Sequence, residues 1–430
     1  MFLKASIILS YVLLLSWFST VSEGVQFNLT LPHQHPDPDV AVQELQRRVN
    51  VSVSKRQLLW NVEKDQSSCL TGNPIDDCWR CDSNGQSNRQ SLADCGIGFG
   101  HDSFGGKGGQ YYEVTDSSDS DEDNPKPGTL RYGVMQTEPL WITFASNMQI
   151  KLKEKLIIKS FKTIDGRGAN VEIVGKGCLA VEFVSNIVIH NIHIHHCVPS
   201  TGSQKSDGDG ISIIGSNHIW VDHCSLSYCR DGLIDVTEGS TAVTISNNYF
   251  TNHDKVMLLG HSDKFEADSG MQVTVAFNHF GQNLVERMPR CRHGYFHVVN
   301  NDYTQWKEYA VGGSANPTIN SQGNRYYAPD NSNLKQVTAR MDADEKEWSR
   351  WNWRSDQDIL VNGAFFVQSG GGKQYAKASS MDVKSPELID SLTANAGVFG
   401  ENRYNYSGLL HTLNLVNFNG GEPSLEKFQA

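Results

Sequence analysis

Short apolar segments recur through the middle of the chain. Each holds β-branched or aromatic residues, followed by Asn or His and a further apolar residue, and they begin at positions 187, 219, 243, 273 and 296 as IVIHNIHI, IWVDHCSL, VTISNNYF, VTVAFNHF and FHVVNNDY. No helical periodicity and no tight hairpin dipeptide separates these segments. Strands at this period predict the stacked coils of a parallel β-helix. A β-sandwich, whose strands recur about every 8 to 12 residues, is the alternative.

Polar residues occupy matching positions in these segments. We expect the repeated Asn, His and Ser side chains to stack inside the turns and to satisfy backbone groups there. In HNIHIHHC, His193 and His195 share one face of a strand, a spacing that also suits a metal. The recurrence of Asn and His at the same repeat position elsewhere favours a structural role.

The flanks of the repeat region carry other patterns. SPELIDSLTANAG predicts a helix with Ser385 as N-cap, Pro386 at its first position and Gly397 after its end. The acidic run TDSSDSDEDNPKPGT, residues 115–129, indicates a solvated surface loop rather than a cation site. The tryptophan cluster near residue 350 fits either a sugar-stacking platform or, more often, a core that covers one flank of the β-helix. Its members are Trp348, Trp351 and Trp353.

The first 24 residues differ from the rest of the chain. Lys4 precedes the apolar run IILSYVLLLSWF, and small residues follow it, which is the pattern of a secretory signal peptide. A membrane anchor is the alternative, but the run is shorter than the roughly 20 residues of a spanning helix. We therefore expect a signal at 1–24, a short extension at 25–65 and one main domain at 66–430, in a secreted protein without a membrane anchor.

Cysteines and sequons agree with that route. Nine cysteines in a secreted chain indicate disulfides and leave at least one free thiol. Cys78 and Cys81 form a C-x-x-C that also suits zinc or redox chemistry, although secretion favours crosslinking. Acceptor sequons for N-glycosylation begin at Asn28, Asn50 and Asn405. The formal charge of −11 leaves no broad basic footprint, which excludes nucleic acid as a partner.

Two acidic motifs lie one repeat apart. SDGDGISI places Asp207 and Asp209 two residues apart before a strand, so both can project from one face. RDGLIDV places Asp231 and Asp235 at equal parity in the next coil, and coils stack about 4.8 Å apart. Four converging carboxylates require a cation, and oxygen ligands favour Ca²⁺. The alternative is that each Asp-Gly pair is an ordinary turn.

Basic residues follow the acidic motifs. NHDKVMLLGHSD supplies Lys255, and VERMPRCR supplies Arg287, Arg290 and Arg292 around Pro289. Together with NPIDDCWRCD, GTLRYGV, TIDGRGA, WVDHCSLSYCRDGLIDV and RMPRCRHGYFHVVNNDY, these motifs closely resemble the plant pectate lyases of the pectate lyase and pectin lyase superfamily. The resemblance spans about residues 65 to 400, and the motifs occur in the family's order.

The resemblance implies a fold and an activity. The family has a right-handed parallel β-helix and cleaves de-esterified polygalacturonan by Ca²⁺-dependent β-elimination. By resemblance, Arg287 is the catalytic base, and Lys255 and Arg292 bind substrate carboxylates. The implied Ca²⁺ ligands are Asp207, Asp209, Asp231 and Asp235. At the position of Asp231 some bacterial members carry Glu, which has one methylene more reach. We expect a monomer that acts on polygalacturonate or low-methyl pectin at the cell wall.

The resemblance also implies disulfide pairs Cys78–Cys95 and Cys178–Cys197, with Cys69 and Cys81 as a further pair. Under this pairing the remaining cysteines are thiols in or beside the coils. They are Cys224, Cys229 and Cys291.

An arginine base is unusual, because arginine is almost fully protonated at neutral pH. Crowding by Ca²⁺, Lys255 and Arg292 favours loss of the Arg287 proton and predicts an alkaline optimum. Arg290 lies outside the family signature and is expected to form a salt bridge. Two other functions remain: a hydrolase on the same fold, and a catalytically silent, allergen-like wall protein.

Overall fold

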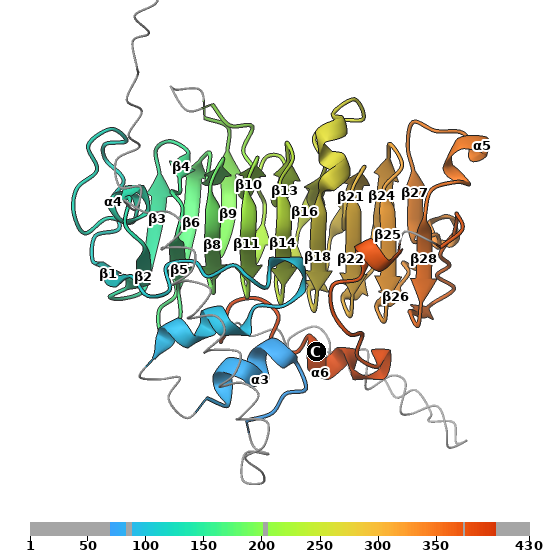
Figure 1. Cartoon of the computed structure of the whole chain (residues 1–430), viewed down its shortest axis with the longest axis horizontal. Coiled ribbons are helices and arrows are strands. Elements are labelled where there is room, and N and C mark those ends of the chain that lie inside the picture. The colour runs from blue at the N-terminus through green and yellow to red at the C-terminus, as the bar shows by residue number, and fades with distance from the viewer. Residues whose placement is uncertain (1–68, 83–87, 201–204, 373–374, 401–430) are drawn as a thin grey trace, which may run out of the picture. The chain divides into compact units, whose positions relative to one another are not determined.

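The computed structural model describes residues 69–82, 88–200, 205–372 and 375–400. The expected signal at 1–24, the extension at 25–65 and the sequons at Asn28, Asn50 and Asn405 lie outside these residues. The described strands stack side by side in three long parallel sheets (Figure 1). The β-helix is therefore confirmed, and it has the right-handed form that the family resemblance implies.

Each sheet takes one strand from each coil. The first sheet consists of β4 (Leu156–Ile157), β7 (Leu179–Glu182), β10 (Ile211–Ile214), β13 (Ile234–Thr237), β17 (Met257–Leu259), β21 (Arg290–Arg292), β24 (Val311–Ser314) and β27 (Thr338–Arg340). The second consists of β1 (Gln110–Val114), β2 (Leu140–Phe144), β5 (Lys162–Asp165), β8 (Ser185–His190), β11 (Asn217–Asp222), β14 (Thr241–Ser246), β18 (Gln272–Ala276), β22 (Tyr295–Val299), β25 (Thr318–Gln322) and β28 (Trp353–Asp356). The third consists of β3 (Met148–Leu152), β6 (Val171–Lys176), β9 (His193–Val198), β12 (Ser225–Ser227), β15 (Tyr249–Thr251), β19 (His279–Phe280), β23 (Asp302–Thr304), β26 (Arg325–Tyr327) and β29 (Ile359–Val361).

A short fourth sheet and several helices complete the described part. The fourth sheet pairs β16 (His253–Lys255) with β20 (Leu284–Glu286). The α-helices are α3 (Pro74–Arg80), α4 (Leu130–Met135), α5 (Glu345–Trp348) and α6 (Ile389–Leu392). The 3₁₀ helices are η1 (Arg89–Cys95), η2 (Gly98–Gly100), η3 (Glu266–Gly270), η4 (Ser332–Leu334), η5 (Tyr375–Ala378) and η6 (Pro386–Leu388).

Register in the sheets explains the hydrophobic pattern. Ile211 of β10 lies opposite Ile234 of β13, which is one coil later and parallel to it. Because side chains alternate along a strand, residues in register point the same way and stack along the axis of the β-helix. Ile211, Ile213 and Ile234 are fully buried in the single large core inside the coils. One apolar residue per coil at each register position is therefore enough to extend this core.

An asparagine ladder runs through one turn of successive coils, as the repeated Asn predicted. Asn248, Asn278 and Asn301 each donate a side-chain Nδ2–H to the Oδ1 of the Asn in the next coil, over 2.9 to 3.0 Å, and Asn324 receives the last of these bonds. All four side chains are buried. The same Oδ1 atoms accept backbone N–H groups, so the ladder satisfies polar backbone that faces away from water.

Removing one rung is expected to destabilise the fold strongly. Asn301→Ala leaves the buried backbone N–H of Asn278 and the carbonyls of Val275 and Val299 without the Asn301 side chain, and a buried group that loses its partner costs about 1 to 3 kcal/mol. We expect the free energy of unfolding to fall by about 3 kcal/mol, measured by denaturant titration. The matched control is the exposed Asn333→Ala, expected to stay within about 0.5 kcal/mol. Equal stability of the two variants would contradict a role for the ladder.

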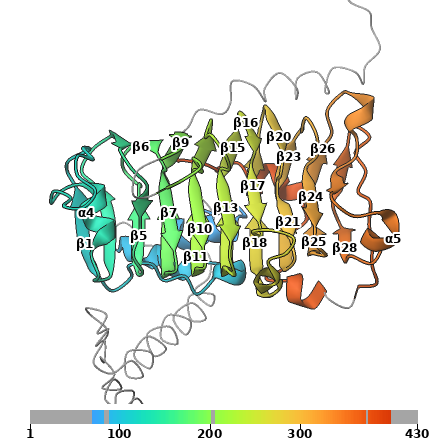
Figure 2. The ribbon, with the colours of Figure 1, turned by 90° about the horizontal axis from the view of Figure 1, so that it is seen from above.

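Segments from both ends of the described chain cover the outer face of the second sheet (Figure 2). Ile75 of α3 and Leu92 of η1 pack in a cluster with Trp141, Trp220 and Phe277 of the sheet side. Leu392 of α6 joins the same cluster. The central strands of the second sheet, such as β11 and β14, are thus largely buried on both faces.

The predicted helix across residues 385–397 is wrong in its length. The chain forms η6 and then α6, which ends at Leu392, and the Ser385 side chain bonds to Glu387 instead of capping a helix. The residues that follow bond to the β-helix: the Gly397 N–H donates to the Asn247 carbonyl and the Val398 N–H to the Ser225 hydroxyl. These bonds to the coils replace the helical ones.

The acidic run 115–129 is mainly exposed, as expected, and its two buried residues are Asp119 and Thr129, the N-cap of α4. Asp119 is buried and accepts two hydrogen bonds from the Arg131 guanidinium, at 2.6 and 2.7 Å. Arg131 also donates to the carbonyls of Glu154 and Lys155. Asp119 therefore anchors the run to the β-helix, and the exposed residues of the run form the solvated loop.

The structure also shows how the cysteines, Trp351, Trp353 and His195 are arranged. The disulfides are Cys69–Cys81, Cys78–Cys95 and Cys178–Cys197, with Cys224, Cys229 and Cys291 free, which confirms the expected pairing. Trp351 and Trp353 are buried in the core. His195 contacts His196 and Glu172, and it joins no group of three metal-ligating side chains in the described part of the chain. No described helix has the length and apolar character needed to cross a bilayer.

Candidate active site

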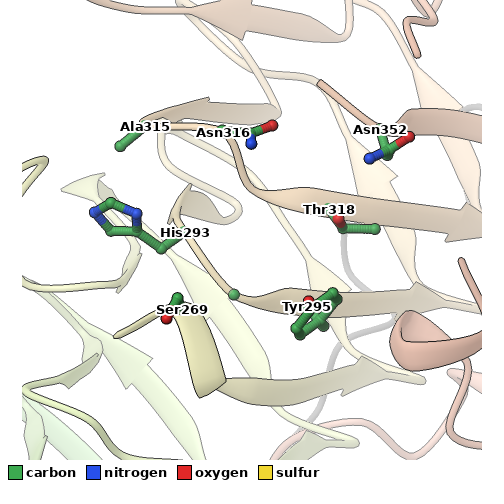
Figure 3. Close-up of a pocket in the computed structure, with 8 residues that line it drawn as sticks. Ser269, His293, Tyr295, Ala315, Asn316, Thr318 and Asn352 are labelled. Atoms are coloured by element: carbon green, nitrogen blue, oxygen red, sulfur yellow. The ribbon is translucent and has the colours of Figure 1, made fainter. Parts of the chain in front are cut away.

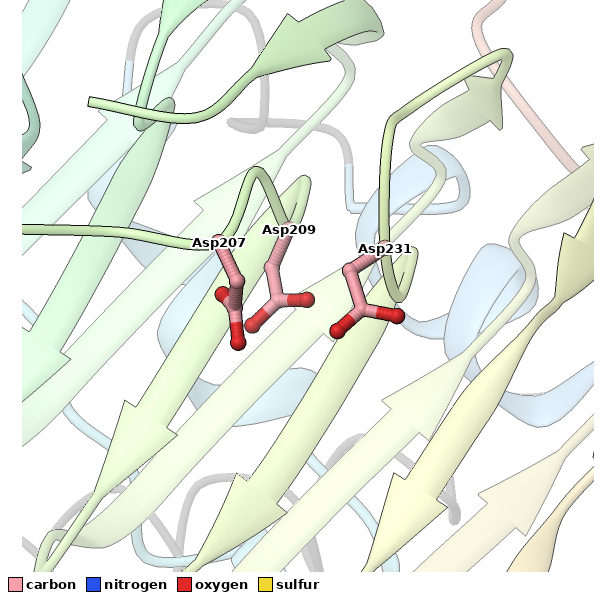
Figure 4. Close-up of side chains that lie close together, drawn as sticks. All are labelled: Asp207, Asp209 and Asp231. Atoms are coloured by element: carbon pink, nitrogen blue, oxygen red, sulfur yellow. The ribbon is translucent and has the colours of Figure 1, made fainter. Parts of the chain in front are cut away.

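Three carboxylates converge at the edge of the first sheet. Asp207 and Asp209 precede β10, and Asp231 precedes β13 in the next coil (Figure 4). One oxygen from each lies within 4.8 Å of the others. Gly208 between the first two has φ of +104°, a left-handed conformation that glycine adopts without strain. Of the four aspartates expected from the sequence, these three are brought together.

Asp209 is the buried member of this acidic cluster. Its carboxylate accepts the Gly232 N–H at 2.8 Å and the Ser212 hydroxyl at 2.8 Å, so its position is fixed by two neighbouring strands. Burial, followed by the charge of Asp207, raises the pKa of Asp209 to about 6. The raised pKa means that a negative charge here is costly until a cation offsets it.

Asp235 lies beside the cluster, within β13. It is in register with Ser212 of β10, and its Oδ1 accepts the Leu258 N–H at 3.1 Å. Burial, followed by the charge of Asp209, raises the pKa of Asp235 well above its ordinary value. Asp235 therefore shares the field of the cluster, although it is not one of the three side chains whose oxygens converge.

The donor set suits a hard divalent cation. All the converging atoms are carboxylate oxygens, which Ca²⁺ prefers and which thiophilic metals do not. The raised pKa values of Asp209 and Asp235 show that like charges are gathered where water cannot fully screen them. These residues fit the ion implied by the family resemblance.

Basic residues occupy the two coils after the cluster. Lys255, the last residue of β16, extends its Nζ to within 3.0 Å of Asp231 Oδ1. Arg287 follows β20 directly, with φ of +64°, and its Nε lies 3.0 Å from Glu286 Oε1. The Met257 N–H donates to the Arg287 carbonyl at 2.8 Å, which ties this turn to the preceding coil. Consecutive coils thus present Asp231, Lys255 and Arg287.

Arg292 and Arg290 both lie in β21 but have different partners. Arg292 donates from Nε to Asp263 at 2.9 Å and from Nη1 to the Gly260 carbonyl at 3.0 Å. Burial, followed by the charge of Arg290, lowers the pKa of Arg292. Arg290 forms an ion pair with Asp342 at 3.6 Å, which confirms the expected salt bridge.

A cavity of about 220 Å³ begins one residue after Arg292 (Figure 3). It is lined by Ser269, His293, Gly294, Tyr295, Ala315, Asn316, Thr318 and Asn352. No carboxylate, ammonium or guanidinium group lines it, so it offers no counter-charge to a polyanion. Sequence reasoning did not anticipate this cavity, because its walls come from turns that are brought together only by the stacking of the coils.

Sequence reasoning also missed Glu286. Its carboxylate forms an ion pair with the Arg287 guanidinium, and only 19% of the Glu286 side chain is exposed. The available signal was an acidic residue placed directly before the arginine in VERMPRCR.

Comparisons with known proteins agree with this geometry. The pectate lyase family model matches residues 142–398. Two Arabidopsis thaliana relatives are "Probable pectate lyase 13", 61% identical over 402 residues that cover 90% of this chain and 80% of the relative, and "Probable pectate lyase 12", 62% identical over 381 residues that cover 85% and 79%.

Solved structures have the same fold. The crystal structure of jun a 1, the major allergen from cedar pollen, aligns with a TM-score of 0.73 and 48% identity, covering 76% of this chain and 99% of the allergen. A Bacillus subtilis pectate lyase variant aligns with a TM-score of 0.52 and 19% identity, covering 70% and 96%, which shows the fold alone. The match of the family model and the identity to relatives over most of the chain show that this chain belongs to the pectate lyase family.

Proposed function

We propose that this protein cleaves de-esterified polygalacturonate by Ca²⁺-dependent β-elimination, as a secreted monomer that acts in the plant cell wall. The observation that supports this most is the order of charges along consecutive coils. The carboxylate cluster, whose buried member Asp209 has a raised pKa, contacts the Lys255 ammonium through Asp231 at 3.0 Å, and Arg287 follows one coil later. This order matches a polyanionic substrate held partly through a cation.

The acidic residues supply the cation site. Asp207, Asp209 and Asp231 would hold Ca²⁺, with Asp235 as a fourth ligand beside them. When bound, Ca²⁺ offsets the charge of the substrate carboxylate next to C5 and so lowers the cost of developing negative charge there. Asp209 is held by Gly232 and Ser212, which keeps this ligand in position without help from substrate.

Lys255 and Arg292 bind carboxylates of the substrate. Lys255 is close to Asp231, so a galacturonate carboxylate near the cluster can accept from its ammonium. Arg292 has two carbonyl partners and Asp263, which hold its guanidinium in one orientation. Both cations stabilise charge where it develops.

Arg287 acts as the base in this proposal. Its guanidine takes the proton from C5, the C5–H electrons form the C4–C5 double bond, and the C4–O4 bond breaks as O4 leaves and is protonated. Only the neutral guanidine accepts a proton, so we retain the expectation of an alkaline optimum. Positive charge from Lys255, Arg292 and the bound cation favours that neutral form.

Two other functions are weaker. A glycoside hydrolase places two carboxyl groups on either side of the scissile bond, about 5 to 9.5 Å apart. Here the oxygens lie within 4.8 Å and converge on one point. A catalytically silent wall protein is the second alternative, in view of the 48% identity to a pollen allergen.

Product analysis separates these functions. Incubation with polygalacturonate and Ca²⁺ is expected to give unsaturated oligogalacturonides that absorb in the ultraviolet, because elimination creates a double bond conjugated to the carboxylate. A chelator should abolish this product, and added Ca²⁺ should restore it. Reducing ends without ultraviolet absorbance would support the hydrolase, and intact polymer under all conditions the silent protein.

A further inference from the structure

The guanidinium of Arg287 is fixed at one nitrogen. Nε donates to Glu286 Oε1 at 3.0 Å, and the two side chains are only 20% and 19% exposed. Among the described residues, the terminal nitrogens of Arg287 have no hydrogen-bond or ion-pair partner in the protein. The carboxylate of Glu286 therefore fixes Nε, and both terminal nitrogens are left without a described protein partner.

Glu286 is itself held by the fold. It ends β20, in register with Lys255 of β16, and the Val256 N–H donates to the Glu286 carbonyl at 3.1 Å. Residues in register point to the same side of parallel strands. Lys255 therefore has Asp231 in the coil before it and Glu286 in the coil after it, so charges alternate along the coils.

Other ionisable groups also face Glu286. Asp254 of β16 and the exposed Glu308 of the following loop add negative charge near it. Tyr309 is buried behind it, and burial followed by the Glu286 charge raises the pKa of that phenol. The charges of Arg287 and Arg290 both act on Tyr309 in the opposite direction and lower its pKa. Glu308 and Tyr309 each interact with Glu286 through a side-chain hydrogen bond, and Arg287 is its ion-pair partner among the described residues.

We propose that Glu286 is a positioning residue for Arg287, which anchors Nε, directs the terminal nitrogens to substrate and sets the pH at which elimination accelerates. This inference rests on the proposed function, in which Arg287 is the base. A carboxylate 3.0 Å from a guanidinium favours its protonated form. Glu286 therefore orients the base and, by the same contact, moves its activity toward higher pH.

A set of variants separates orientation from charge. Glu286→Gln keeps an acceptor for Nε and removes the charge, so the acid limb of the pH profile of kcat/KM should move down by about one unit, a tenfold gain at a fixed pH on that limb. Glu286→Asp keeps the charge with shorter reach, so kcat should fall about tenfold with KM and the profile unchanged. The control Glu345→Gln removes an exposed carboxylate of α5 that has no described contact with Glu286 or Arg287 and should leave the profile in place.

The same series shows which idea fails. A Glu286→Gln profile that superimposes on that of the unaltered enzyme would overturn the inference, as would a Glu286→Asp enzyme with full kcat. Arg287→Ala is measured alongside. Full activity of Arg287→Ala would overturn the proposed base itself, whereas an inactive Arg287→Ala with an unshifted Glu286→Gln overturns only the role of Glu286. If Glu286→Gln does not fold, as judged by thermal unfolding, the kcat of Glu286→Asp decides.

Discussion

Arg287→Ala is expected to lower kcat roughly 10²- to 10⁴-fold, the range over which a positioned general base accelerates a reaction. KM for polygalacturonate should change little, because Lys255, Arg292 and the cation site carry most of the substrate binding in the proposed mechanism. The fold should tolerate the change. Arg287 is bonded only to Glu286 among the described side chains, and it is not one of the residues of the hydrophobic core.

The matched control for this prediction is Arg290→Lys, at the arginine three residues later that begins β21. Arg290 pairs with Asp342 and lies outside the proposed machinery, so its replacement should leave kcat within about threefold. The rate of ultraviolet-absorbing product is measured at saturating substrate and Ca²⁺ from pH 6 to 10. Undiminished product from Arg287→Ala, with an intact fold, would contradict Arg287 as the base.

The fold could be predicted from sequence because its information is local and repeated. Each coil repeats an apolar strand at a fixed position, and the segments from residues 243, 273 and 296 also place an Asn in the following turn. Stacked in register, these segments give the buried core and the ladder from Asn248 to Asn324. A repeat spacing of 23 to 32 residues is the length of one coil, which passes through all three long sheets. Strands of a β-sandwich do not need so long a spacing.

Contacts between distant segments could not be predicted in this way. Asp119 appears in an acidic run whose pattern is that of a solvated loop, and only the fold brings the Arg131 guanidinium and the Lys153 N–H to it. The helix expected to end before Gly397 stops at Leu392, and the residues after it bond to the Asn247 carbonyl and the Ser225 hydroxyl of the coils. No local pattern in either segment carries information about its partner.

The candidate site was predictable to a similar degree. Equal parity and the spacing of coils were enough to expect Asp207, Asp209 and Asp231 on one patch, and these three converge. The same reasoning treats Asp235 as equivalent, although its position within β13 and its bond from Leu258 set it beside the convergence point. Glu286 was missed because the alternation of side chains along a strand does not show whether a carboxylate pairs with the arginine next to it in the sequence.

The second large effect is that of pH on the cation site. Ionisation of Asp209 lowers the stability of the Ca²⁺-free protein, whereas the same ionisation is needed to bind Ca²⁺. Asp209 has a pKa of about 6, raised by burial and then by Asp207, so the folded protein binds this proton more tightly than the unfolded chain. Between about pH 4 and 6, stability therefore falls as pH rises, and the ionised group costs about 3 kcal/mol above pH 6. Ca²⁺ binds only the ionised form, so its affinity should fall about tenfold for each pH unit below 6.

Asp209→Asn is expected to separate these effects. Because Asn cannot ionise, the Ca²⁺-free variant should be more stable than the unaltered Ca²⁺-free protein at pH 8, by about 1 to 3 kcal/mol. Its Ca²⁺ affinity should fall on the order of 10- to 100-fold, because one charged ligand is lost. Calorimetric titration with Ca²⁺ measures the affinity, and unfolding in the presence of chelator measures the stability.

The control Asp263→Asn removes a carboxylate that binds Arg292 outside the cluster, and it should leave Ca²⁺ affinity unchanged. An Asp209→Asn protein that is less stable without Ca²⁺, or that binds Ca²⁺ as tightly as before, would contradict the assignment, because repulsion among ligands and affinity for the cation have the same origin.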